Sequence, residues 1–204
     1  MRIYLIGCMP EGKNSDLEER IMKILLAAVN AKYIHSNLAV YSLKAYAEDP
    51  AVEIGEYTIN QQKDDILMDI YKRQPDILCL SCYIWNLDYI EEIVLEIGKL
   101  RPDMPIWLGG PEVSYHAEEM LGQYPFLDGI MKGEGEITFR ELAVYYQNQE
   151  NGTEGKTLEE IHGITYRDAE GAIKSNPWRP VMDLSEVDFP YANLKKFENR
   201  IIYY

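Results

Sequence analysis

The fold of this chain is decided by the stretch Ile106-Trp107-Leu108-Gly109-Gly110-Pro111-Glu112-Val113-Ser114. Its apolar half predicts a buried strand, and the double glycine followed by proline predicts that the strand ends there in a loop. In an open parallel sheet, loops at the carboxyl ends of the strands bind ligands. Two adjacent glycines would let a flat or bulky ligand lie against the backbone, although a tight turn that needs positive φ explains them equally well.

Apolar runs and amphipathic segments alternate along the rest of the chain. The predicted strands cover residues 23–29, 52–58, 77–82, 106–109 and 127–131. Five helices are predicted between and after them: one that starts at Ser36, one over 64–73, one that ends near Pro102, one over 114–122 and one that follows Lys132–Glu136. The clearest helix places Ile90, Ile93, Val94, Ile97 and Leu100 on one face. Five strands interleaved with five helices predict an α/β fold with a doubly wound, five-stranded parallel sheet, flavodoxin-like or Rossmann-like, with strand order 2-1-3-4-5.

The chain is expected to have three parts. Residues 1–21 are polar and the chain begins afresh at Met22, so they are interpreted as an N-terminal extension. Residues 22–148 form the α/β domain, and residues 149–204 form a linker, a β-hairpin that turns at Asp168–Gly171 and an extended, proline-bearing strap. The apolar run 201–204 has no turn or cap after it, which predicts that the natural protein continues.

Composition narrows the class of protein. The net charge of −14 without a basic cluster disfavours nucleic-acid and anionic-membrane partners. The longest apolar run, residues 24–29, is far shorter than a bilayer span, which predicts a soluble protein. Three cysteines suit a reducing cytoplasm. Cys79 and Cys82 have the spacing of a metal pair, but on one buried strand they point to opposite faces and are expected to pack as small apolar residues.

The loops after the predicted strands are expected to converge on one site. These are Asn30–Asn37, Ser81–Asn86 and Gly109–Glu112, with Gly133–Glu136 beside them. They carry hydroxyls, amides, glycines and aromatic rings, without the Ser/His/Asp or Cys/His sets of nucleophilic catalysis, which favours holding a ligand. The glycine pattern lacks both the G-x-G-x-x-G of a dinucleotide site and a P-loop.

Several motifs together resemble the N-terminal region of cobalamin-binding-domain radical SAM proteins. They are Gly109-Gly110-Pro111, the segment Lys132–Leu142 with its Gly-Glu-Gly-Glu, the segment 161–171 and Asp183–Pro190. The resemblance implies a B12-binding Rossmann-like domain, a hairpin and strap, and a downstream radical SAM barrel of the same chain as its partner. It implies cobalamin as the cofactor, with a [4Fe–4S] cluster and S-adenosylmethionine in the full-length protein, and a reaction of the methyl-transfer or radical-rearrangement class. The CxxxCxxC motif of the family is not present, so this chain alone is expected to have no turnover.

The resemblance also assigns residues to the ligand. Ser81 corresponds to a hydroxyl near the nucleotide tail of cobalamin, Gly109 and Gly110 make room for that tail, and Gly133–Gly135 flank it. Tyr83 and Trp85 are candidates to cover the corrin. The cofactor-binding residues proposed in this way are Lys32, Tyr33, His35, Ser36, Asn37, Ser81, Cys82, Tyr83, Trp85, Gly109, Gly110, Pro111, Glu112, Gly133, Glu134 and Gly135, with no catalytic residue and no metal ligand.

Structural alternatives stay open for these residues. Ser81 could simply bond backbone, and the glycines at 133–135 could only cap a helix. A bulky side chain at Gly110 is expected to fill the ligand space and leave the fold intact. Alternative functions are a cobalamin-free substrate-docking or assembly module and a flavodoxin-like binder of another cofactor.

The loop after the first strand predicts how cobalt is held. Many cobalamin enzymes supply a histidine from a D-x-H-x-x-G loop at this place. Here Asn30 replaces the aspartate, Lys32 the histidine and His35 the glycine. We therefore expect base-off binding without a histidine ligand, with Lys32, Tyr33 and His35 only nearby.

Overall fold

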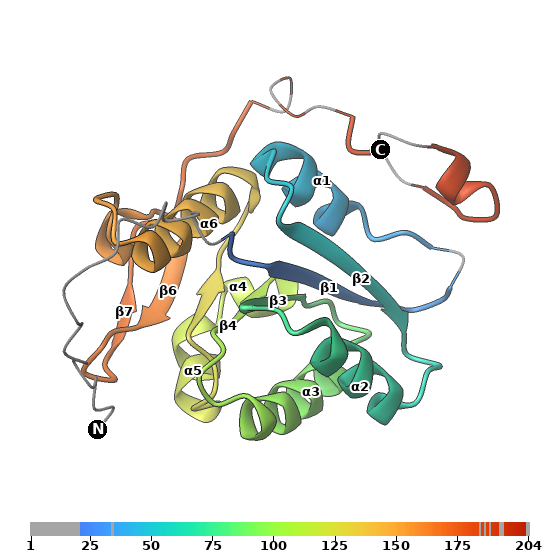
Figure 1. Cartoon of the computed structure of the whole chain (residues 1–204), viewed down its shortest axis with the longest axis horizontal. Coiled ribbons are helices and arrows are strands. Elements are labelled where there is room, and N and C mark those ends of the chain that lie inside the picture. The colour runs from blue at the N-terminus through green and yellow to red at the C-terminus, as the bar shows by residue number, and fades with distance from the viewer. Residues whose placement is uncertain are drawn as a thin grey trace, which may run out of the picture.

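The computed structural model describes residues 21–33, 35–183, 185, 187, 189–191 and 194–202 (Figure 1). Residues 1–20 of the expected extension 1–21, and residues 203 and 204 of the run 201–204, lie outside the described residues. In the described ranges, no helix is both long enough and apolar enough to cross a membrane. The structure is a central sheet with helices packed on both faces (Figure 1).

The elements follow the predicted alternation. The strands are β1 (Ile24–Asn30), β2 (Val52–Thr58), β3 (Ile77–Ser81), β4 (Ile106–Gly109), β5 (Gly129–Met131), β6 (Ile164–Arg167) and β7 (Ile173–Ser175). The helices are α1 (Leu38–Ala47), α2 (Lys63–Arg73), α3 (Leu87–Leu100), α4 (Pro111–Ser114), α5 (Ala117–Gln123) and α6 (Glu136–Asn151), with 3₁₀ turns at Leu158–Glu160 and Leu194–Phe197.

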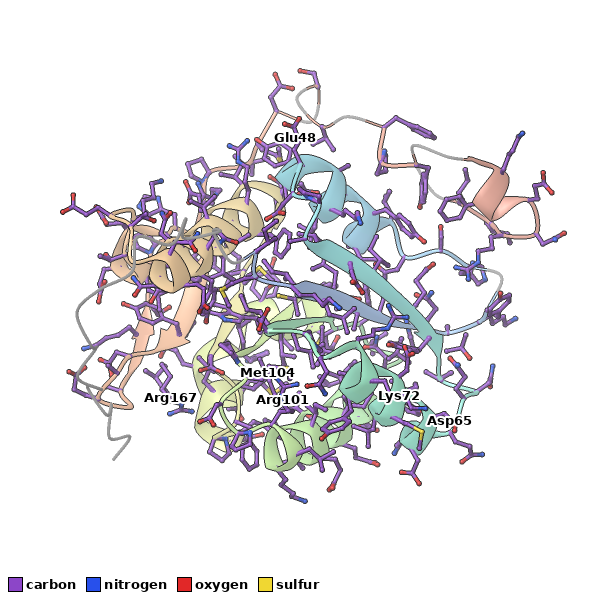
Figure 2. All side chains as sticks on the ribbon, viewed as in Figure 1. Glu48, Asp65, Lys72, Arg101, Met104 and Arg167 are labelled. Atoms are coloured by element: carbon purple, nitrogen blue, oxygen red, sulfur yellow. The ribbon has the colours of Figure 1, made fainter. Side chains whose placement is uncertain are left out.

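The sheet has the order β2-β1-β3-β4-β5-β6-β7. Its first five strands are parallel, which confirms the predicted order 2-1-3-4-5. The sheet is larger than the five strands expected, because the hairpin pairs antiparallel with β5 and extends it to seven. This pairing covers the edge that β5 would otherwise expose. Arg167 fastens the hairpin, since its guanidinium donates to the carbonyl of Leu121 at the end of α5 (2.6 Å; Figure 2).

Two predicted helix starts are wrong. The first helix begins at Leu38, two residues after Ser36, because the side chain of Asn37 caps it by accepting from the Val40 amide. The helix expected over 114–122 is two helices, α4 and α5. Pro111 suits the first turn of α4, and Ser114 closes that turn instead of opening a helix.

Two apolar cores hold the layers together. One core packs beneath α2, α3 and α5, and the other beneath α1 and α6 (Figure 1). Successive strand residues enter opposite cores. Cys82 lies in the first core and Cys79 in the second, which confirms that the two thiols face apart.

Candidate functional site

A cleft with a volume of about 420 Å³ opens at the carboxyl ends of β3, β4 and β5, on the face covered by α1 and α6. Its apolar lining comes from Leu26, Val40, Leu43, Cys79 and Met131. Its polar lining comes from Ser81, Ser114, Glu134 and Glu136 and from the backbone of the glycines at 109, 110, 133 and 135. An apolar cleft with a few placed polar groups is the usual form of a small-molecule site.

The two glycines at the end of β4 have different roles. Gly110 has φ +118°, and a Cβ there would lie 2.2 Å from the carbonyl oxygen of Cys82. A Cβ at Gly109 would make only ordinary contacts, the nearest being 3.6 Å from Cε of Met131. Gly110 is therefore required by the backbone, whereas Gly109 leaves space in the cleft. The expectation that a bulky side chain at Gly110 leaves the fold intact is wrong, because it would collide with backbone.

Ser114 joins the two glycine loops that line the cleft. Its hydroxyl donates to the carbonyl of Gly110 (2.8 Å) and accepts from the amide of Gly133 (3.2 Å). Sequence reasoning did not assign Ser114 to the site. The only available signal was its place at the end of the stretch that begins at Ile106.

The strap (residues 176–191) holds the loop after β5. Gly133 has φ +72°, and the Trp178 ring lies 3.4 Å from the position of its missing Cβ. The carboxylate of Glu134 accepts from the amide of Met182 (2.7 Å). Gly135 is the N-cap residue of α6 and also lines the cleft. The glycine loop therefore both starts a helix and borders the cleft, which were the two alternatives for it.

Ser81 lines the cleft at the end of β3. The side-chain amide of Asn37 donates to this oxygen (3.1 Å), so a side chain, not backbone, is the partner in this bond. Because the hydroxyl is the acceptor here, it can still donate its proton to a ligand. The loop after Ser81 is fixed by buried Asn86, whose side chain donates to the carbonyls of Val29 (2.9 Å) and Ser81 (3.0 Å) and accepts from the amide of Tyr83 (2.8 Å).

Two tyrosines from different loops line the cleft, and each packs against a tryptophan. Tyr83 lines it and stacks on Trp85 with ring centroids 4.5 Å apart. Burial raises the pKa of Tyr83, so its phenol stays protonated. Tyr115 also lines the cleft, is exposed, and packs on Trp178 with centroids 5.4 Å apart. Sequence reasoning missed Tyr115 and Trp178, because a single aromatic residue in a loop carries no periodic signal.

Half of the sixteen residues proposed from the sequence line the cleft. These are Ser81, Tyr83, Gly109, Gly110, Pro111, Gly133, Glu134 and Gly135. The structure places Lys32, Tyr33, His35, Ser36, Asn37, Cys82, Trp85 and Glu112 outside the lining. Cys82 is buried in the other core. The loop between β1 and α1 is instead engaged by the end of the chain, as the Ser36 amide donates to the carbonyl of Ile201 (3.1 Å) and the Ser36 hydroxyl bonds that of Tyr191 (2.9 Å).

The thiol of Cys79 offers a test of the cleft. Burial raises the pKa of Cys79 to about 12, so the thiol is protonated and poorly nucleophilic near neutral pH. Cys8→Ser removes the third cysteine, which lies outside the described residues, and leaves Cys79 and Cys82, both buried. At about pH 8, where a free thiol reacts readily, we expect Ellman's reagent to label these two thiols about 100-fold more slowly in the folded protein than in urea. Rapid labelling of the folded chain at Cys79 would contradict its burial.

The sequence of this chain is similar to a known domain family and to known enzymes. A family model described as B12 binding domain matches residues 24–143. The 2-(S-pantetheinyl)-carbapenam-3-carboxylate methyltransferase of Streptantibioticus cattleyicolor is 28% identical over 156 residues, covering 73% of this chain and 22% of the relative. The cobalamin-dependent radical SAM methyltransferase TokK of Streptomyces tokunonensis is 27% identical over 139 residues, covering 63% of this chain and 19% of the relative.

Among solved structures, the cobalamin-dependent S-adenosylmethionine radical enzyme OxsB, with aqua-cobalamin and S-adenosylmethionine bound, has the same fold. The TM-score is 0.68 at 24% identity, and the match covers 89% of this chain and 26% of that chain. This chain therefore spans about a fifth to a quarter of the length of these three proteins.

Proposed function

The chain belongs to the B12-binding domain family, and on this premise we propose that the cleft at the ends of β3, β4 and β5 is its cobalamin site. The observation that carries the proposal is that Gly109, which lines the cleft, has no side chain although the backbone there would tolerate one. Space kept open in this way beside an apolar lining fits the flat base of the nucleotide tail. The hydroxyl of Ser81 fits a polar atom of the same tail.

Each part of the cleft has a proposed role. Gly109 leaves room for the tail, and Gly110 allows the backbone turn beside it. Ser81 donates a hydrogen bond to the tail, and Gly133–Gly135 flank it with backbone. The stacked pair Tyr83 and Trp85 covers the corrin. When bound, cobalamin supplies a cobalt centre that supports methyl transfer or radical rearrangement.

A second part of the proposal concerns the whole protein. The relatives include radical SAM methyltransferases, and this chain spans only a fraction of their length. We propose that a radical SAM barrel with a [4Fe–4S] cluster and S-adenosylmethionine works with this domain in the same chain. We propose a cytoplasmic location, which the three cysteines support because they cannot form a disulfide framework.

Binding of hydroxocobalamin tests the site. We expect the chain to retain about one equivalent after desalting, seen as corrin absorbance in the visible spectrum. If the desalted protein carries no corrin, the proposal fails and a docking or assembly module is favoured. Retention of a flavin in place of the corrin would instead favour a flavodoxin-like binder.

Electron paramagnetic resonance of bound cob(II)alamin tests how cobalt is held. His35 does not line the cleft, and its backbone forms a bridge with Ile201 while its carbonyl accepts from the side chain of Asn30 (3.0 Å). We therefore expect base-off binding with cobalt lines that nitrogen does not split. A nitrogen triplet that disappears in His35→Ala would show that His35 is the ligand.

A further inference from the structure

The end of the described chain returns to the loop between β1 and α1 (Figure 1). Ile201 forms a parallel bridge with His35, and the guanidinium of Arg200 lies over the Tyr33 ring, 4.8 Å from its centroid. Arg200 also pairs with Glu56 in the middle of the edge strand β2, 144 residues earlier in the chain. A segment outside the predicted α/β domain thus contacts the loop between β1 and α1.

Glu56 is the centre of these contacts. Its side chain is only 8% exposed. One carboxylate oxygen accepts from the Asn30 side chain (3.0 Å) and from the Asn37 amide (3.0 Å). The other accepts from the Tyr41 hydroxyl (2.7 Å) and from Arg200. A buried carboxylate is costly unless it is paired and hydrogen-bonded, and Arg200 supplies the opposite charge.

The contacts continue from Glu56 into the cleft. Glu56 accepts a hydrogen bond from the backbone amide of Asn37. The side chain of Asn37 in turn donates to the hydroxyl of Ser81 (3.1 Å). Ser81 lines the cleft. Hydrogen bonds therefore connect Arg200 to the cleft through Glu56, Asn37 and Ser81.

We propose that Arg200 and Glu56 are positioning residues, which hold Asn37 and thereby aim the Ser81 hydroxyl at the ligand. Without Arg200, the Glu56 carboxylate would be buried without its cation and would turn toward water, releasing the Asn37 amide. The segment around Arg200 thus sets the geometry of the cleft. This inference rests on the proposed function for the identity of the ligand, not for the path itself.

Arg73, at the end of α2, provides a matched control because it also pairs with a carboxylate of β2. It pairs with Glu53 of β2 (3.5 Å) and with Asp69 (2.8 Å), on the face of the sheet that α2 covers. This network does not line the cleft. A variant of Arg73 therefore removes an ion pair from β2 without touching the path to Ser81.

The experiment compares Arg200→Met, Arg200→Lys and Arg73→Met in the full chain. Methionine keeps an apolar stem without the charge, and lysine restores the charge. Hydrogen exchange of the Asn37 amide is read in the cobalamin-free protein against the amide of Cys82, which donates to the carbonyl of Gly109 (2.7 Å) between β3 and β4. The dissociation constant for hydroxocobalamin is read by spectral titration.

We expect Arg200→Met to speed exchange at Asn37 about tenfold relative to Cys82 and to weaken hydroxocobalamin binding about tenfold. Arg200→Lys should restore most of both, and Arg73→Met should change neither. Equal effects of Arg200→Met and Arg73→Met, or faster exchange at Asn37 with unchanged affinity, would overturn the inference. If the parent chain does not bind hydroxocobalamin, the proposed function fails, and the exchange measurement still decides whether Arg200 positions Asn37.

Discussion

Replacing Gly110 with alanine is expected to lower the free energy of unfolding by at least about 3 kcal/mol. Two costs add at this position. The backbone at φ +118° and ψ 170° is open essentially to glycine alone, and the new Cβ would lie 2.2 Å from the carbonyl oxygen of Cys82. The new Cβ is attached to one backbone segment and meets another, and neither can move aside as a flexible side chain could. The loop between β4 and α4 would have to shift.

Urea unfolding measures this effect, with Gly122→Ala as the control. Gly122 lies in α5 and a Cβ there meets nothing within 4 Å. Alanine at that position should be neutral or stabilise the protein by up to about 1 kcal/mol, because it lowers the entropy of the unfolded chain. Equal stability of the Gly110 variant and the control would show that the loop does not need glycine at residue 110.

Replacing Gly109 with leucine is expected to weaken hydroxocobalamin binding more than about 100-fold while the protein remains folded. The backbone tolerates a Cβ at Gly109, whose nearest neighbours are side-chain atoms of Met131 at 3.6 and 3.7 Å. The rest of the leucine side chain would then occupy the space in the cleft that we assign to the nucleotide tail.

Spectral titration and circular dichroism separate binding from folding in this variant. Gly109→Ala is the graded partner, since one methyl group takes far less of the volume and should cost much less affinity. Gly122→Leu adds the same side chain at a position that does not line the cleft, and it should bind as the parent does. A folded Gly109→Leu protein with parental affinity would mean that the ligand does not use this cleft.

The strap and hairpin contribute to the cleft although they follow the predicted α/β domain. Trp178 covers Gly133, and the amide of Met182 holds the carboxylate of Glu134. Lys132, at the end of β5, donates to the Ser175 hydroxyl (2.9 Å) and the Asn176 carbonyl (2.9 Å). A chain shortened at residue 148 would lose these supports, so binding experiments call for the full chain.

The sequence by itself determined the five parallel strands, their order, the end of β4 at the double glycine and the opposite faces of Cys79 and Cys82. Each of these depends on residues close together in the chain, whose periodicity and turn chemistry can be read directly. It also determined the family, because the motifs around Gly109 and Lys132 are local patterns. Ser81 and the glycine loops could be predicted as site residues for the same reason, because they belong to such local patterns.

Only the tertiary structure decided which edge the hairpin covers, and which half of the proposed residues line the cleft. It also showed Ser114 between two loops, the ring pair of Tyr115 and Trp178, and the pairing of Glu56 with Arg200. These contacts join residues far apart in the chain, and no spacing or periodicity relates their positions. They arise when sheet pairing and core packing bring distant segments together, so a single sequence carries no local signal for them.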